Sequence, residues 1–245
     1  MNWLREFEAE AERRRRREDP PWSRGARLHP DLARSVQRFQ VGEAGDGANL
    51  IAKAAGDDGY LAAVKLFVAE EQNHARMLAE LLKAAGVPTI AAHWSDTVFV
   101  RLRRALGLRL ELMVLLIAEV VALRYYRALR DGTADPLVTQ VAARILADEE
   151  RHVPFHCDRL RAGFAGLPRA GRATVFGAWR VLLLGVAVTV AADHGPALRR
   201  LGVGRLVFVA DVLTAFEAAL ARIRGDEPKP KPRHVPKRAR PRGLV

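Results

Sequence analysis

The sequence has little of what several large protein classes require. It contains a single cysteine, Cys157, so an intrachain disulfide is excluded and a reducing compartment is favoured. Its valine and isoleucine residues do not form period-two runs, so strands are not indicated. No G-x-G-x-x-G fingerprint occurs. If the chain performs redox chemistry, its electrons must therefore come from a separate reductase or from the substrate.

The sequence also lacks an apolar run long enough to cross a bilayer. Its most apolar stretch, 181–193, has about 13 residues, whereas a spanning helix needs about 20. The N-terminal residues carry charges throughout, which a secretory signal does not. We therefore predict a buried helix at 181–193, no membrane span and a cytoplasmic location.

Acidic residues are missing from one end of the chain. Of the net charge of +12, residues 229–245 contribute +7, because they include seven Lys or Arg and no Asp or Glu. This proline-rich composition predicts a disordered basic tail over 225–245. Such a tail can also contact RNA, anionic lipid or an acidic partner, so a nucleic-acid contact stays an alternative.

Helix-forming residues, in contrast, are abundant. Ala, Leu, Arg and Glu dominate a composition that is 49 % hydrophobic and 28 % charged, which predicts an all-α globular protein. Turn signals divide the rest into helices over about 30–55, 60–85, 98–129, 137–164, 173–193 and 205–223. Residues 1–18 are expected to form a charged amphipathic helix. Pro154 is expected to kink its helix or to free a carbonyl group.

These helices divide the chain into four predicted parts. Residues 1–29 form a charged N-terminal segment, and residues 30–165 form a four-helix bundle. Residues 170–224 form two accessory helices that pack on the bundle, and 225–245 is the tail. The length of 245 residues suits this organisation.

Two strings of the form Glu-x-x-His lie inside the helical segments, at Glu71–His74 and Glu149–His152. Residues three apart share one helix face, so each string aims a carboxylate and an imidazole at one point. Both strings lie within apolar stripes, where a carboxylate is costly unless it is paired or binds a metal. Carboxylate oxygen and imidazole nitrogen together bind first-row transition metals, so the strings predict a metal site.

Each string also has a lone glutamate at a matched distance upstream. Residues of two antiparallel helices meet when they are equidistant from the connecting turn. Glu43 and Glu71 average to position 57, inside the turn 56–59, and Glu119 and Glu149 average to position 134, inside the turn 131–136. The spacing therefore predicts that four glutamates and two histidines lie at one height of the bundle, a di-metal carboxylate arrangement.

With these six residues, the segment 30–165 resembles the ferritin-like di-iron and di-manganese superfamily. The resemblance implies that Glu71 and Glu149 bridge two metals, while Glu43 and Glu119 are terminal ligands. His74 and His152 would each supply one nitrogen. The strings Glu-Glu-x-x-His and Asp-Glu-x-Arg-His are similar to those of oxygen-activating members rather than of storage ferritins.

Three further residues are candidates for a supporting role. Asp148 lies one turn before His152 and is a candidate partner for a ligand imidazole. His156 lies one turn beyond His152, and either supports the site or is a core histidine. Tyr126 shares the face of Glu119, and is either a redox tyrosine or, by the commoner pattern, a core aromatic.

A function follows from the resemblance and from the charges. Four glutamates offset the charge of two divalent ions, which suits two iron ions, although manganese accepts the same ligands. The resemblance implies a non-haem di-iron oxidoreductase that uses O₂ and an external electron donor. Its reaction would hydroxylate, desaturate or N-oxygenate a small organic substrate.

Three alternatives stay open on the sequence alone. They are a ferroxidase or iron-binding ferritin-like protein, a tRNA-modifying hydroxylase on the same scaffold, and a metal-free helical bundle. The helices beyond 165 and the tails argue against a minimal storage subunit. The sequence does not fix the oligomeric state, and a homodimer is one option.

Overall fold

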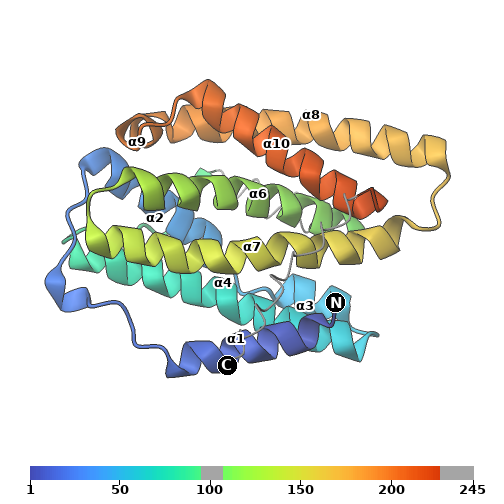
Figure 1. Cartoon of the computed structure of the whole chain (residues 1–245), viewed down its shortest axis with the longest axis horizontal. Coiled ribbons are helices and arrows are strands. Elements are labelled where there is room, and N and C mark those ends of the chain that lie inside the picture. Colours follow the sequence, from blue (N-terminus) through green and yellow to red (C-terminus); the bar gives the residue numbers. More distant parts are fainter. Residues whose placement is uncertain (95–106, 227–245) are drawn as a thin grey trace, which may run out of the picture.

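The computed structural model describes residues 1–94 and 107–226, and within these ranges the chain is helical and has no strand (Figure 1). This confirms the all-α fold class. The described elements are α1 (Trp3–Arg16), a 3₁₀ turn η1 (Trp22–Arg24), α2 (Pro30–Glu43), α3 (Ala48–Ala54), α4 (Asp58–Ala84), α6 (Leu108–Gly132), α7 (Pro136–Phe164), α8 (Arg169–Asp193), α9 (Gly195–Arg200) and α10 (Arg205–Arg224).

Helices α2, α4, α6 and α7 form a four-helix bundle, in which α2 packs on α4, α4 on α7 and α7 on α6 (Figure 1). The short turns before α4 and α7 end at aspartate caps. Asp57 accepts a hydrogen bond from the Tyr60 N–H at 3.1 Å. Asp135 accepts from the Leu137 and Val138 N–H groups, and Pro136 fits the first helical position. Both hairpins therefore turn where the sequence predicts.

The predicted continuous helix over 30–55 is wrong, because the structure divides it into α2 and α3. Helix α2 ends at Glu43, and Gly47 then adopts a left-handed conformation with φ of 64°. Asp46 accepts a hydrogen bond from the Ala48 N–H at 3.1 Å, which starts α3. The turn-forming string Gly45-Asp46-Gly47 outweighs the apolar periodicity around it. Glu43 consequently lies at the very end of α2 rather than inside a helix.

The predicted helix over 137–164 is present as α7. Helix α7 continues through Pro154. The start of the predicted helix over 98–129 and most of the predicted tail over 225–245 lie outside the described residues.

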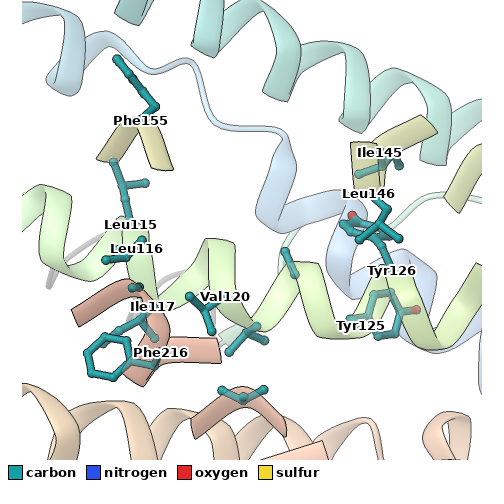
Figure 2. Close-up of a cluster of buried hydrophobic side chains, with 14 of the residues drawn as sticks. Leu115, Leu116, Ile117, Val120, Tyr125, Tyr126, Ile145, Leu146, Phe155 and Phe216 are labelled. Carbon is teal, nitrogen blue, oxygen red and sulfur yellow. The ribbon is translucent and has the colours of Figure 1, made fainter. Parts of the chain in front are cut away.

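The core of the bundle is built from one apolar stripe per helix. Figure 2 shows part of it, with Ile117 of α6 beside Phe216 of α10, and Tyr125 and Tyr126 farther along α6. All four side chains are buried. The core thus continues from the bundle into the layer made by the C-terminal helices.

The N-terminal helix α1 packs on the outer side of α4 (Figure 1). Phe7 is buried and stands edge-on to Phe155 at a ring distance of 5.0 Å. The Trp3 indole donates a hydrogen bond to Asp158 of α7 at 3.0 Å. The predicted charged N-terminal segment is thus a folded part of the structure and touches the bundle.

Helices α8, α9 and α10 form a layer over α6 and α7 on the opposite side from α1 (Figure 1). The two accessory helices predicted after residue 170 are present, and the short helix α9 connects them. The predicted burial of 181–193 is only partly right. Leu183 and Ala187 are buried, whereas Val181 and Val188 are 72 % and 52 % exposed, because α8 is an outer helix that packs through one face.

Within the described part of the chain, α8 is long and apolar enough to cross a membrane by length and composition alone. Only 28 % of its most apolar window is buried. The prediction that the chain lacks an apolar stretch long enough to span a membrane is therefore wrong for α8, although one such helix is weak evidence for a membrane span and its Leu183 face packs on the core.

Candidate metal centre

The structure brings all six predicted ligand residues together. Two groups of side chains each hold their ligand atoms within 4.8 Å of one another. The first group contains Glu43, Glu71, His74 and Glu149, and the second contains Glu71, Glu119, Glu149 and His152. Glu71 and Glu149 belong to both groups. This sharing is the arrangement in which two carboxylates bridge two metals.

The imidazoles face the carboxylates through their Nδ1 atoms. His74 Nδ1 lies 3.4 Å from Glu71 and 3.5 Å from Glu149. His152 Nδ1 lies 3.2 Å from Glu71, 3.4 Å from Glu119 and 3.5 Å from Glu149. Both histidine side chains are fully buried. Each imidazole is therefore aimed at the shared carboxylates from its own end of the site.

These side chains fit a di-metal centre because their inward atoms lack other partners. Glu71 Oε1, Glu149 Oε2 and the Nδ1 atoms of His74 and His152 are buried and make no hydrogen bond. A buried polar atom without a partner costs about 1–3 kcal/mol. Four such atoms that converge on one spot are explained by cations that they would coordinate. Carboxylate-rich sets with imidazole suit iron or manganese.

The outward nitrogen of each histidine is held by an acid from the other string. His74 Nε2 lies 3.0 Å from Asp148, and His152 Nε2 lies 2.9 Å from Glu70. Each acid directly precedes the glutamate of its own Glu-x-x-His string. The two strings are therefore cross-linked, since each supplies the acid that orients the partner's imidazole.

Two arginines complete this outer layer. Arg151 Nη2 donates to Asp148 at 2.5 Å and to Glu70 at 3.2 Å, so it joins the two acids. Arg14 of α1 donates to Glu70 at 2.6 Å. Two acids and two arginines balance in charge. The N-terminal helix thus contributes directly to the support of the candidate ligands.

Loss of the Glu70 carboxylate should weaken metal binding without removing any candidate ligand. We expect Glu70→Gln to lower metal affinity by about 10- to 100-fold, because the amide orients His152 poorly and leaves Arg151 short of a counter-charge. Competition with a chromophoric chelator measures the change. Glu80→Gln, at a partly exposed position of α4 where the carboxylate lies 3.7 Å from Lys83, is the matched control. Equal affinity in both variants would show that Glu70 does not support the site.

The crowding of buried acids changes their proton affinities. Burial raises the pKa of Glu43 to about 7, and the charge of Glu71 adds to the rise. Burial and repulsion by Glu119 raise the pKa of Glu149 well above its usual range. Burial alone would also raise the pKa of Glu119, but contact with His152 outweighs it and holds the pKa well below its usual range.

The two histidines take up positive charge in the same cluster. Burial alone would lower the pKa of His74, but Asp148 and Glu43 outweigh it and raise that pKa well above its usual value. Glu119 and Glu149 do the same for His152. Bound protons therefore offset part of the negative charge of the carboxylates. Metal ions would replace these protons, so metal binding would release protons.

The three supporting candidates take different places. Asp148 contacts the imidazole of His74, not that of the nearby His152. Tyr126 is buried, and its hydroxyl donates to Glu43 Oε1 at 2.6 Å. His156 is buried in the aromatic core beside Phe67, with its Nε2 3.5 Å from Glu119 Oε1.

Sequence reasoning missed Glu70 and Arg14. Glu70 carries a readable signal, because both Glu-x-x-His strings are directly preceded by an acid. Arg14 carries none, because it lies in a run of arginines and reaches the site across 56 residues of sequence. A charge run of this kind is ordinarily a solvated face.

A cavity of about 670 Å³ opens onto the carboxylates. Glu43, Glu71, Glu119 and Glu149 lie in its wall. Most of the remaining wall is apolar and comes from α2, α6 and α8. These lining residues include Phe39, Leu115, Ala118, Val121, Ala122, Leu182, Val186 and Val190. The candidate metal centre therefore faces a space of the size that small-molecule sites have.

The comparisons with known proteins agree with this geometry. A family model described as p-aminobenzoate N-oxygenase AurF matches residues 58–203, more than half of the chain. The matched range contains five of the six candidate ligands and α8, and Glu43 precedes it. No curated protein and no solved structure was found to match. The chain therefore belongs to the AurF family, a family of ferritin-like di-iron oxygenases.

Proposed function

We propose that the protein is a di-iron N-oxygenase that uses O₂ to oxidise the amino group of an aromatic amine. The observation that carries the proposal is the position of the carboxylate cluster in the wall of an apolar cavity. Metal ligands and a substrate-sized space thus share one boundary. The family description names an aromatic amine as substrate and N-oxygenation as reaction, and the cavity suits such a molecule.

The six candidate ligands would bind the two iron ions in the following way. Glu71 and Glu149 would bridge two iron ions, with Glu43 and His74 on one and Glu119 and His152 on the other. When bound, the irons would supply the redox chemistry that reduces O₂.

The cavity would exclude water and position the substrate. Apolar side chains from α6 and α8 would keep water away from the reacting nitrogen. Phe39 would offer its ring edge or face to the aromatic ring of the substrate. Electrons beyond those of the substrate would come from an external donor.

Iron is the metal that we propose, and manganese is the alternative that the same ligands accept. The choice of iron is supported by the family, whose members are di-iron enzymes. The family also favours an oxygenase over the ferroxidase and tRNA hydroxylase alternatives.

The proposal predicts a specific product. Protein loaded with Fe(II) under argon, then given O₂, a chemical reductant and an aniline, should form the aryl hydroxylamine or a more oxidised nitrogen product. Mass spectrometry with ¹⁸O₂ should show oxygen from the gas in that product. Iron-free protein and the Glu149→Ala protein serve as controls. Ring hydroxylation, or no turnover of any arylamine by the loaded protein, would contradict the proposal.

A further inference from the structure

We propose that the protein docks on an anionic lipid bilayer through the outer side of its C-terminal layer. This docking surface consists of the outer side of α8, the short helix α9 and the first turn of α10, on the opposite side of the molecule from α1 (Figure 1). Helix α8 lies flat on the bilayer and does not cross it. The proposal goes beyond the proposed reaction and does not depend on it, because no candidate metal ligand takes part in the contact.

The exposed apolar side chains of the protein are concentrated in this layer. Among the described residues, seven large apolar side chains are exposed, and five of these belong to α8 or α10. Three of the five share one side of α8, because they are three or four residues apart, and two lie in the first turn of α10. A cluster of this kind marks a contact surface, whereas single exposed apolar residues do not. The five are Val181, Leu184, Val188, Leu206 and Val207.

The same part of the chain carries an excess of positive charge. Residues 165–210 contain six arginines, no lysine and a single acidic residue, Asp193. The carboxylate of Asp193 lies 2.9 Å from Arg38 of α2, so it does not offset these arginines. An apolar surface with this charge is complementary to a bilayer that has negatively charged head groups.

The arginines lie at both ends of the apolar stretch. Arg169 is the first residue of α8, whereas Arg199 and Arg205 follow its last turn, and all three are exposed. Between them, residues 173–192 include one charged residue, Arg180, which donates to a glutamate of α10 at 2.8 Å. Apolar helix sides with basic residues around them are typical of helices that lie in the plane of a membrane surface. The long arginine side chains can then reach the head groups.

The contacts of α8 with the core require that it lies flat. Trp179 is buried, and its indole donates to the backbone oxygen of Met113 at 3.1 Å. Leu183 and Ala187 follow at intervals of four residues on the same side and are also buried. A helix that crossed the bilayer would leave these partners and expose the core of the protein to water. The apolar stretch, roughly 30 Å long, therefore runs along the bilayer surface.

A second copy of the chain is the competing occupant of this surface. If two α8 helices packed in antiparallel directions, the arginine at the start of one would approach those that follow the end of the other. If they packed in parallel directions, equivalent arginines would approach each other. Either arrangement places positive charge against positive charge, which is unfavourable. Charge complementarity therefore favours the bilayer over a second copy.

The docking surface adjoins the cavity beside the candidate metal centre. Val181, Gly185 and Thr189 of α8 are exposed, and they also line this cavity. Trp94, which is 56 % exposed, lines it as well. The cavity therefore reaches the molecular surface beside the docking surface, where an apolar molecule dissolved in the bilayer would enter it.

Vesicle flotation with the full-length protein tests the proposal. Vesicles of phosphatidylcholine alone are compared with vesicles that contain equal amounts of phosphatidylcholine and the anionic lipid phosphatidylglycerol. The protein should float with the anionic vesicles and bind the neutral ones at least about 10-fold more weakly, because the arginines add to the apolar contact only on a negative surface. Raising the salt concentration should reduce this difference.

Variants separate the apolar contact from the charges. Leu184→Glu should weaken binding by about 10- to 100-fold, because a charge replaces an apolar side chain in the contact. The double variant Arg199→Gln/Arg205→Gln should weaken binding to anionic vesicles by about 25-fold, or about fivefold for each arginine, and leave binding to neutral vesicles unchanged. The matched controls are exposed positions of α1, on the opposite side of the molecule, and Ala9→Glu and Arg15→Gln should bind as the wild type does.

Circular dichroism and metal content show whether each variant is folded, and light scattering without vesicles gives the oligomeric state. Flotation of the wild type with neither kind of vesicle would overturn the proposal. Wild-type binding by Leu184→Glu would also overturn it, because the contact would then lie elsewhere, for example in the basic residues 229–245.

A third result would assign the surface to a second copy of the chain. In that case the wild type would be a dimer that binds no vesicles, and Leu184→Glu would make it monomeric. A failure of the proposed function is distinct from all three results. If the protein binds anionic vesicles through α8 but oxidises no arylamine, the docking surface stands and the proposed reaction is wrong.

Discussion

Replacing Glu149 with alanine should remove both metal ions from the protein, whereas replacing Glu119 should remove about one. Glu149 belongs to both groups of candidate ligands, and Glu119 belongs to one. Without Glu149, each metal position loses a quarter of its protein ligands and the charge that the two positions share. Metal analysis after iron loading and removal of excess iron measures the number of ions per chain.

The adjacent residue supplies the control for this prediction. Glu150 is exposed on the other face of α7 and lies 3.8 Å from Arg127, so Glu150→Ala should keep both ions. Circular dichroism should show that all three variants stay helical, because removal of one buried like charge does not unpack the bundle. Identical losses from Glu149→Ala and Glu119→Ala would mean that Glu149 does not bridge two metals.

The grouping of these six residues could be predicted because it depends on local regularities. Helical periodicity places a glutamate and a histidine of each string on one face, and turn residues fix where each hairpin reverses. Asp57 and Asp135 cap the second helix of each hairpin, close to the predicted midpoints. Equal distance from the turn then brings Glu119 opposite Glu149. No tertiary information enters this argument.

Other parts of the site depend on contacts that sequence periodicity does not encode. Arg14 reaches Glu70 from a separate helix, and Arg38 meets Asp193 across 155 residues of sequence. Such contacts are decided by how α1 and α8 dock on the bundle. Because both arginines look like ordinary surface charges in the sequence, only the three-dimensional arrangement separates them from their neighbours.

Which residues of α8 are buried could also not be predicted from the sequence. Composition alone favours burial of 181–193. In the structure, α8 packs on the bundle through one face only, and Val181 and Val188 are exposed to solvent. Val181 and its neighbours Leu182 and Val186 also line the cavity. The apolar character of this helix therefore also builds the wall of the proposed substrate site.

The break between α2 and α3 leads to the second large expected effect, in which Gly47→Ala destabilises the protein by about 2–5 kcal/mol. Gly47 has φ of 64°, and a side chain in that conformation costs about 1–2 kcal/mol. A Cβ atom there would also lie 2.4 Å from Cγ2 of Val68 on α4, and such overpacking adds about 1–3 kcal/mol. Chemical denaturation of the metal-free protein measures the loss of unfolding free energy.

Gly56→Ala separates the two contributions to this effect. Gly56 also has a positive φ, of 104°, but nothing lies within 4 Å of a Cβ atom built on it. It should therefore show the backbone cost without the clash, and lose less stability than Gly47→Ala. Gly47 follows Glu43 by four residues, and a Cβ atom at Gly47 would push against α4, the helix that carries Glu71. Gly47→Ala should therefore also weaken metal binding, whereas Gly56→Ala should not. Equal stability losses would show that α4 yields to the added methyl group.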